Sequence, residues 1–227
     1  MNKSQLANTI DHTLLRANVT RGGLIELCRT AMRWGFHSVA INSAVVSLCR
    51  ETLGDSPVVC DATVGFPLGQ MSIESKVFEA RDAIKNGAGE IDYVVDLVAV
   101  KSGDWAHVED EMARINAACR EHGAGCKVIF ETCYLTDDEK ERLCDIACRV
   151  RPTFIKTSTG FGTPVPGTPN GATLADIRLM KRCVGDEVLI KASGGIRTTE
   201  QALAMLEAGA SRIGTSNGVA IVEGFVE

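Results

Sequence analysis

Two kinds of apolar pattern alternate along the chain. Short apolar runs such as 38–42 are followed by segments in which apolar residues recur every three or four positions, as after Thr20 and Ser72. The runs are typical of buried strands, and the longer segments are typical of amphipathic helices. The pattern predicts an N-terminal strand over 8–14 and seven further strands, which lie at 38–42, 58–64, 90–96, 127–131, the run from Phe154 to Lys156, the run from Val188 to Lys191, and 212–215.

Glycine closes four of the predicted helices just before the next strand, at Gly35, Gly87, Gly123 and Gly209. A glycine there supplies the left-handed cap that ends a helix. The repeated helix–glycine–strand unit predicts parallel strands joined by helical crossovers. Eight such strands in roughly 200–250 residues indicate a single-domain (β/α)8 TIM barrel over residues 1–227. The competing open, doubly wound sheet would favour a G-x-G-x-x-G turn after the first strand, and the sequence has none there.

Composition excludes several classes of protein. The net charge of −5 argues against a protein that binds nucleic acid through its phosphates. No run of about 18 apolar residues is present, so we expect no membrane span. The N-terminus has no apolar signal core, and the nine cysteines are scattered without a C-x-x-C pair. These features predict a cytoplasmic protein with reduced thiols. The four histidines form no metal-binding pair, so we expect neither a metal nor another cofactor.

Two stretches of similar build carry the candidate chemistry. In 154–161 and in 188–195, an apolar run delivers a lysine that is followed by small residues and glycine. If the inward faces of the strands carry Lys156, Lys191 and Asp92, these groups converge at the barrel mouth. Asp11 and Glu131 could reach the same mouth.

Three interpretations of these lysines stay open on the residues alone. Their ammonium groups could reach water at the strand ends, or they could form a self-neutralising buried cluster. Alternatively, one amine could lose its proton through burial and repulsion from the other, attack a carbonyl and form an imine. A nearby carboxylate would then transfer protons. The pattern does not decide which lysine attacks.

A second signal concerns phosphate. Gly194 and Gly195 immediately precede a predicted helix, and 214–218 follows the last strand. Glycines allow close approach of the backbone, and amides at helix N-termini bind anions. Because loops after the seventh and eighth strands are the usual phosphate position in such barrels, we expect a small phosphorylated substrate.

Several segments, in order, resemble the deoxyribose-phosphate aldolase family of class I, imine-forming aldolases. They cover nearly the whole chain and are 10–15, 64–69, 89–92, 127–132, 156–161, 191–197 and 212–216. The resemblance implies reversible cleavage of 2-deoxy-D-ribose 5-phosphate to D-glyceraldehyde 3-phosphate and acetaldehyde. It also implies deoxyribonucleotide catabolism in the cytoplasm and a homodimer.

The same resemblance implies roles for individual residues. Lys156 would form the imine, Lys191 would lower its pKa and join proton transfer, and Asp92 would shuttle protons. Asp11 would be a partner of Lys191 behind the site. The residues expected at the substrate and its phosphate are Thr13, Leu15, Thr159, Gly160, Gly194, Gly195, Gly214, Ser216 and Asn217.

Four features depart from the family pattern. Some relatives carry a cysteine at the position of Ala40 and a lysine at the position of Phe161, and some end in a tyrosine where this chain ends at 225–227. The Pro-rich loop 163–170 is also longer than usual. These departures bear on substrate preference and turnover. Two alternatives remain: an imine-forming barrel enzyme with another phosphosugar or aldehyde substrate, or a barrel that only binds a phosphorylated metabolite.

Overall fold

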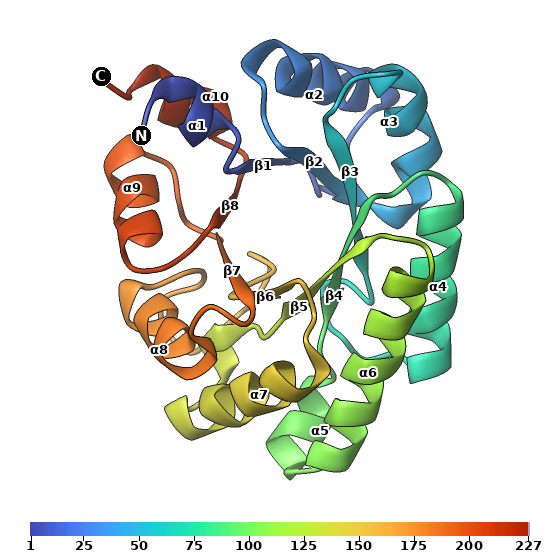
Figure 1. The fold of residues 1–227 in the computed structure, drawn as a ribbon, viewed down its shortest axis with the longest axis vertical. Coiled ribbons are helices and arrows are strands. Elements are labelled where there is room, and N and C mark those ends of the chain that lie inside the picture. Colours follow the sequence, from blue (N-terminus) through green and yellow to red (C-terminus); the bar gives the residue numbers. More distant parts are fainter. Residues whose placement is uncertain (227) are drawn as a thin grey trace.

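A closed barrel of eight parallel strands forms the centre of the molecule. In the computed structural model, which describes residues 1–226, each strand pairs with its neighbours in chain order and β8 closes onto β1 (Figure 1). This confirms the predicted TIM barrel. The strands are β1 (Ile10–Thr13), β2 (Ser38–Asn42), β3 (Val59–Val64), β4 (Glu90–Val94), β5 (Gly125–Ile129), β6 (Phe154–Lys156), β7 (Leu189–Ser193) and β8 (Arg212–Thr215).

Helices surround the barrel, as Figure 1 shows in the view along its axis. They are α1 (Lys3–Ala7), α2 (Arg21–Trp34), α3 (Val46–Leu53), α4 (Ile73–Lys85), α5 (Leu97–Ser102), α6 (Trp105–Glu121), α7 (Asp137–Val150), α8 (Leu174–Val184), α9 (Thr199–Glu207) and α10 (Gly218–Glu223). Two 3₁₀ turns, η1 (Ser43–Val45) and η2 (Thr132–Tyr134), follow β2 and β5. Glu227, the last residue of the C-terminal segment 225–227 that departs from the family pattern, lies outside the described residues.

Local interactions define the helix ends, including the four ends predicted at glycines. Thr136 and Glu139 form a capping box at the start of α7, and Thr198 and Gln201 form another at the start of α9. Each box satisfies backbone N–H groups that have no partner inside the helix. The four predicted terminating glycines all have positive φ, as at Gly35, where φ is 67°. These local signals therefore place the crossovers between the strands.

Several predicted strand boundaries are wrong by one or two residues, and the largest shifts that bear on the site are in β4 and β5. β5 was expected over 127–131 but covers Gly125–Ile129, and β4 ends at Val94 rather than at residue 96. Asp96 leaves the sheet because its carboxylate accepts hydrogen bonds from Val98 N and Ala99 N, which begins α5. Side-chain capping of this kind competes with strand pairing.

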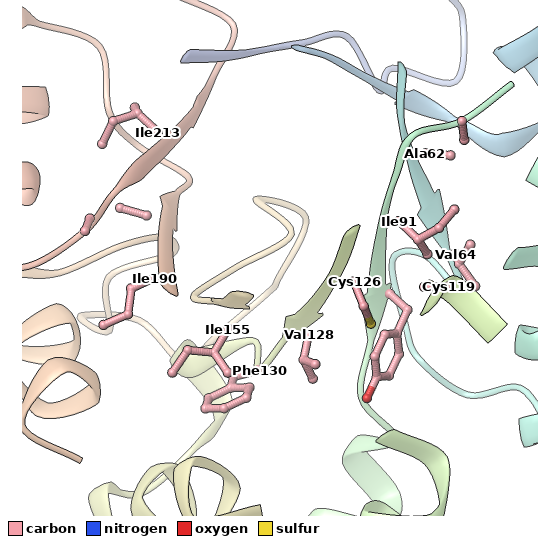
Figure 2. Packing of buried hydrophobic residues seen from close by; sticks show 14 of the residues in the cluster. Ala62, Val64, Ile91, Cys119, Cys126, Val128, Phe130, Ile155, Ile190 and Ile213 are labelled. Atoms are coloured by element: carbon pink, nitrogen blue, oxygen red, sulfur yellow. The ribbon is translucent and has the colours of Figure 1, made fainter. Parts of the chain in front are cut away.

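The outward faces of the strands form the main apolar layer. Ile91, Val128, Ile155 and Ile190 are fully or almost fully buried between the barrel and the helices (Figure 2). Because successive side chains of a strand point to opposite faces, the neighbours of these residues point into the barrel. The apolar layer thus holds the strands in place while leaving the interior to other side chains.

Two further expectations concern cysteines and membranes. All nine cysteines are free, and six of them are buried, including Cys28, Cys60 and Cys126, as expected for small apolar core residues. Among residues 1–226, no helix combines the length and the apolar character that crossing a membrane would require.

Candidate active site

The strand register brings the predicted lysines together. Lys156 on β6 is paired with Lys191 on β7, and both side chains point into the barrel. Their ammonium nitrogens approach the same atom, Asp92 Oδ2 on β4, at 2.6 Å from Lys156 and 2.7 Å from Lys191. Two cations that share one carboxylate oxygen are close enough to repel each other. The structure therefore assembles the three groups whose convergence was predicted.

Lys156 has few anionic neighbours for a buried lysine. It is 4% exposed, and Asp92 is its one carboxylate partner within ion-pair distance among the described residues. Burial lowers the pKa of Lys156, and the charge of Lys191 lowers it further, whereas Asp92 opposes the shift. The net pKa lies below the usual value for a lysine. An amine in this environment loses its proton more readily than an exposed one.

Lys191 differs because more carboxylates surround it. Its Nζ lies 2.6 Å from Asp11, 2.8 Å from Asp61 and 2.7 Å from Asp92. Burial disfavours its charge, but these three carboxylates outweigh burial and raise its pKa. Lys191 is therefore held as an ammonium group beside Lys156. The predicted contact between Asp11 and Lys191 is present in this geometry.

A third lysine, Lys127 on β5, was not predicted as a site residue. Its Nζ lies 2.8 Å from both Asp61 and Asp92 and 2.7 Å from Glu90, and its pKa is raised by these carboxylates despite full burial. The predicted strand 127–131 placed this lysine at a strand end, where a solvated ammonium is common. With β5 at Gly125–Ile129, it lies in mid-strand and points inward.

The barrel interior is consequently a network of opposite charges. Arg212 Nη1 lies 2.9 Å from Asp11 and 3.1 Å from Glu90. Asp92, bound by three lysines, has a pKa held well below its usual value although burial opposes this. Burial and the neighbouring charge of Asp92 raise the pKa of Asp61 to about 6. Buried charges are tolerated when each has such partners.

Three of these carboxylates lie near enough to one another to suggest a cation site. They are Asp11, Asp61 and Glu90, whose oxygens approach within 4.8 Å of one another. Lys127 Nζ already lies between them, at 4.0 Å from Asp11 and at shorter range from the other two. The ammonium group supplies the positive charge that a metal ion would otherwise bring.

Above this network, a cavity of about 200 Å³ opens at the C-terminal ends of the strands. All the predicted substrate and phosphate residues line it, together with Lys156. They are Thr13, Leu15, Thr159, Gly160, Gly194, Gly195, Gly214, Ser216 and Asn217. Segments up to about 200 residues apart in sequence thus meet around one small space, as TIM barrels allow.

Steric constraints explain why glycine occupies two positions in this cavity. Gly194 has a φ of 87°, and a Cβ there would lie 2.8 Å from Gly171 Cα. A Cβ at Gly214 would lie 2.8 Å from Ser193 Cβ and 3.1 Å from Lys191 Cε. Larger residues would therefore displace the loop after β7 or the lysine itself. Bare backbone lines this side of the cavity, as an anion site requires.

Four further residues line the cavity but were not predicted as site residues: Ser193, Ile196, Arg197 and Thr215. Arg197 lies two residues after the glycine pair, and this spacing could have predicted a positive charge near the phosphate. Ser193 Oγ donates to Ser158 O at 2.6 Å and joins the loops after β6 and β7.

Phe161 lies beside a second, larger cavity of about 500 Å³. Its ring meets that of Phe66 edge-on, with centroids 5.3 Å apart. The Pro-rich loop 163–170 is tied back by Asn170 Nδ2, which donates to Gly162 O, and by Tyr134, whose hydroxyl accepts from Thr163 N. Within residues 1–226, no residue of this loop lines either cavity.

Comparisons with known proteins identify the family of the chain. Residues 6–224 match the model of the DeoC/LacD family aldolases. The chain belongs to this aldolase family. Like its family, this aldolase is a carbon–carbon lyase of class I.

Individual relatives span nearly the whole aldolase. The chain is 49% identical to the deoxyribose-phosphate aldolase of Lactobacillus acidophilus, over 96% of this chain and 89% of that one. It is 48% identical to that of Thermococcus gammatolerans, over 96% of each chain. A solved deoxyribose-phosphate aldolase structure from Aeropyrum pernix superposes with a TM-score of 0.87 at 32% identity, covering 98% of this chain and 91% of that one.

Proposed function

We propose that this aldolase cleaves 2-deoxy-D-ribose 5-phosphate reversibly to D-glyceraldehyde 3-phosphate and acetaldehyde, through an imine on Lys156. The relatives named deoxyribose-phosphate aldolase support the substrate. The observation that carries the mechanism is the contrast between Lys156, which has a lowered pKa and lines the cavity, and Lys191, which has a raised pKa and lies behind it. Only an unprotonated amine attacks a carbonyl.

In this proposal, the Lys156 amine adds to the aldehyde carbon of the open-chain sugar, and loss of water gives a protonated imine. The substrate's C3 hydroxyl then loses its proton, the C2–C3 bond breaks, and its electrons pass to the imine nitrogen. D-Glyceraldehyde 3-phosphate leaves as the first product. The remaining enamine takes a proton on carbon, and water releases acetaldehyde and the free amine.

Asp92 and Lys191 are proposed to move the protons. Asp92 Oδ2 lies 2.6 Å from Lys156 Nζ, within the reach required of a proton acceptor for that amine. The same oxygen lies 2.7 Å from Lys191 Nζ, so this carboxylate links the two amines that are proposed to take part in proton transfer. Asp11 is proposed to hold Lys191 in place from behind, since it contacts that ammonium at 2.6 Å.

The phosphate is proposed to bind where the loops after β6, β7 and β8 meet. Gly160, Gly194 and Gly195 bring backbone to the cavity, and Ser216 supplies a hydroxyl. Arg197 offers the positive charge that the family pattern would place at Phe161. Backbone amides and one guanidinium suit a dianionic phosphate group.

Borohydride trapping tests this proposal directly. The protein is incubated with acetaldehyde and sodium borohydride, and the reduced adduct is mapped by mass spectrometry. We expect one adduct on Lys156, none in Lys156→Ala, and an unchanged adduct in Lys101→Ala, which removes an exposed lysine. An adduct that persists on another residue in Lys156→Ala would contradict the assignment. Product analysis with deoxyribose 5-phosphate separates this substrate from other phosphosugars.

Assembly and location also belong to this proposal. We propose a homo-oligomeric, cytoplasmic enzyme of deoxyribonucleotide catabolism, with the homodimer as the expected form. The Aeropyrum pernix relative is described as a tetramer. Light scattering of the purified protein distinguishes a dimer from a tetramer or a monomer.

A further inference from the structure

Glu131, directly after β5, has an unusual backbone conformation. Its φ of 56° and ψ of 61° are left-handed. Within residues 1–226, the only other non-glycine residue with positive φ is Arg151, which forms an ordinary cap at the end of α7. Left-handed backbone is unfavourable for a glutamate, and it persists where surrounding contacts impose it. The contacts of Glu131 therefore indicate what its conformation serves.

Both carboxylate oxygens of Glu131 accept hydrogen bonds from Thr159, and Oε1 also accepts a long one from the Cys133 thiol at 4.0 Å. Thr159 N donates to Oε1 at 3.1 Å, and the Thr159 hydroxyl donates to Oε2. The same hydroxyl accepts from Phe161 N at 2.9 Å. Glu131 is 1% exposed, so these bonds replace the water that the carboxylate gives up. One side chain thus fixes the backbone from residue 159 to residue 161.

This fixed segment lies against the proposed phosphate position. Thr159 and Gly160 line the cavity of about 200 Å³, whereas Glu131 lines the larger cavity on the other side of the segment. Residues 157–162 have no helix or strand of their own to hold them. The backbone pairing on either side of Glu131, from Phe130 N to Lys156 O and from Thr132 N to Thr157 O, stops before Thr159.

We propose that Glu131 is a positioning residue for phosphate recognition: its carboxylate holds residues 159–161 in the conformation in which the cavity accepts the phosphate group of the substrate. This inference rests on the proposed function and extends it. Glu131 acts through Thr159 and does not touch the reacting carbon. Both carboxylate oxygens accept hydrogen bonds from Thr159, and Glu131 does not line the smaller cavity beside Lys156.

The test compares two substrates that differ only in the phosphate. Steady-state rates are measured with deoxyribose 5-phosphate and with unphosphorylated 2-deoxyribose for the wild type and for Glu131→Leu. We expect KM for the phosphorylated substrate to rise about tenfold, as for the loss of one or two hydrogen bonds. We expect its kcat, and both constants for 2-deoxyribose, to stay within about twofold. An equal loss with both substrates, or an unchanged KM for the phosphorylated one, would overturn the proposal.

Glu79 offers a matched control. Its carboxylate also binds one backbone amide and one hydroxyl, Gly65 N at 2.9 Å and Ser43 Oγ at 2.7 Å, but neither residue lines the smaller cavity. We expect Glu79→Leu to leave KM for deoxyribose 5-phosphate within about twofold of wild type. A rise as large as that in Glu131→Leu would show a general effect of loop loosening and would contradict the specific role.

A conservative variant and a binding measurement keep the test decisive if Glu131→Leu fails to fold. Glu131→Gln keeps an oxygen for Thr159 N, so we expect an intermediate KM. Binding of inorganic phosphate, followed by calorimetry, should weaken about threefold in Glu131→Gln. If the wild type cleaves neither sugar, the proposed function fails, and this phosphate measurement still decides the role of Glu131: unchanged phosphate affinity would overturn it.

Discussion

The inner and outer faces of the barrel wall are built from alternate residues of the same strands, yet they hold opposite kinds of side chain. On β6, Ile155 points outward into the apolar layer beneath the helices, and the next residue, Lys156, points inward to Asp92. The outer face stabilises the fold by removing apolar surface from water. The inner face is stable only because each charge has partners, so the arrangement of those partners determines its chemistry.

The three inward lysines show how that arrangement works. Lys127 and Lys191 are each surrounded by several carboxylates, which raise their pKa in spite of burial. Lys156 contacts one carboxylate, which it shares with both other lysines, and its pKa is lowered. Burial is common to all three. The number of carboxylates around each ammonium, together with access to the cavity, distinguishes the proposed nucleophile.

Removing Lys191 tests this distinction most strongly. In Lys191→Met, Asp11 and Asp61 lose a compensating charge and the repulsion on Lys156 disappears, so its amine holds its proton more tightly. We expect kcat/KM at neutral pH to fall on the order of a thousandfold, since each unit of pKa removes a factor of ten of free amine.

The same variant should shift the pH profile. Activity rises with pH where the free amine forms, and this rise should move to higher pH in Lys191→Met. The profile is measured between pH 6 and pH 10, conditions chosen to span the expected rise. A wild-type rate in this variant would remove Lys191 from the proposed mechanism.

Replacing the shared carboxylate separates imine formation from bond cleavage. Asp92→Asn keeps the shape of the side chain but removes the proton acceptor 2.6 Å from Lys156 Nζ. We expect the borohydride adduct to form while turnover of deoxyribose 5-phosphate falls about a hundredfold. Trapping and turnover are measured on the same preparation. Normal turnover would point to another group as the proton carrier.

Lys127 should matter more for stability than for imine formation. In Lys127→Met, the carboxylates of Asp61, Asp92 and Glu90 lose their common partner, and we expect the free energy of unfolding to fall by about 3–5 kcal/mol. Denaturant unfolding measures this change. The adduct on Lys156 should still form, and its absence in a folded Lys127→Met protein would make Lys127 part of the chemistry.

A buried ion pair outside the barrel wall provides the control for Lys127. Lys76 on α4 lies 2.5 Å from Glu111 on α6, with both side chains fully buried. Lys76→Met should destabilise the protein by a similar amount. It should leave the pH profile of the reaction unchanged, whereas Lys127→Met should shift it upward because Asp92 keeps fewer positive neighbours. If Lys76→Met and Lys127→Met had the same pH profile, the charges inside the barrel would have no special influence on the reaction.

The smallest effect concerns His12, which packs outside the barrel against the ring of Phe36. Burial lowers its pKa from 6.5 to about 4. Between these values the unfolded chain binds a proton that the folded protein does not, so stability is lost as pH falls through this window. When the pH is lowered from 6.5 to 4.5, His12 should reduce the free energy of unfolding of the wild type by about 1–2 kcal/mol. This contribution should be absent in His12→Leu.

Subtracting the variant from the wild type isolates this histidine. Asp61 titrates with the opposite sign, because its pKa is raised to about 6 and the folded state binds the extra proton. That contribution is present in both proteins and cancels. Chemical denaturation at the two pH values supplies the measurement, and an identical pH dependence in wild type and His12→Leu would show that His12 does not titrate in this window.

The fold, and the residues around the smaller cavity, could be predicted from local sequence patterns and from the family resemblance. Strand runs, amphipathic helix patterns and terminating glycines such as Gly35 depend on neighbouring residues, and they predicted the eight-stranded barrel. The two predicted lysines and Asp92 also met as expected. Local signals failed for β5, whose predicted start placed Lys127 at the strand end rather than in mid-strand.

Periodicity, capping and spacing by themselves determined that parallel strands alternate with helices and that two lysines arrive at one end of the barrel, because these depend on residues near one another in the chain. Only the tertiary structure decided which charges surround each lysine. Asp11, Asp61 and Arg212 lie far apart in sequence, and barrel closure between β8 and β1 brings them together. The ionisation of Lys156 therefore depends on distances that no local pattern contains.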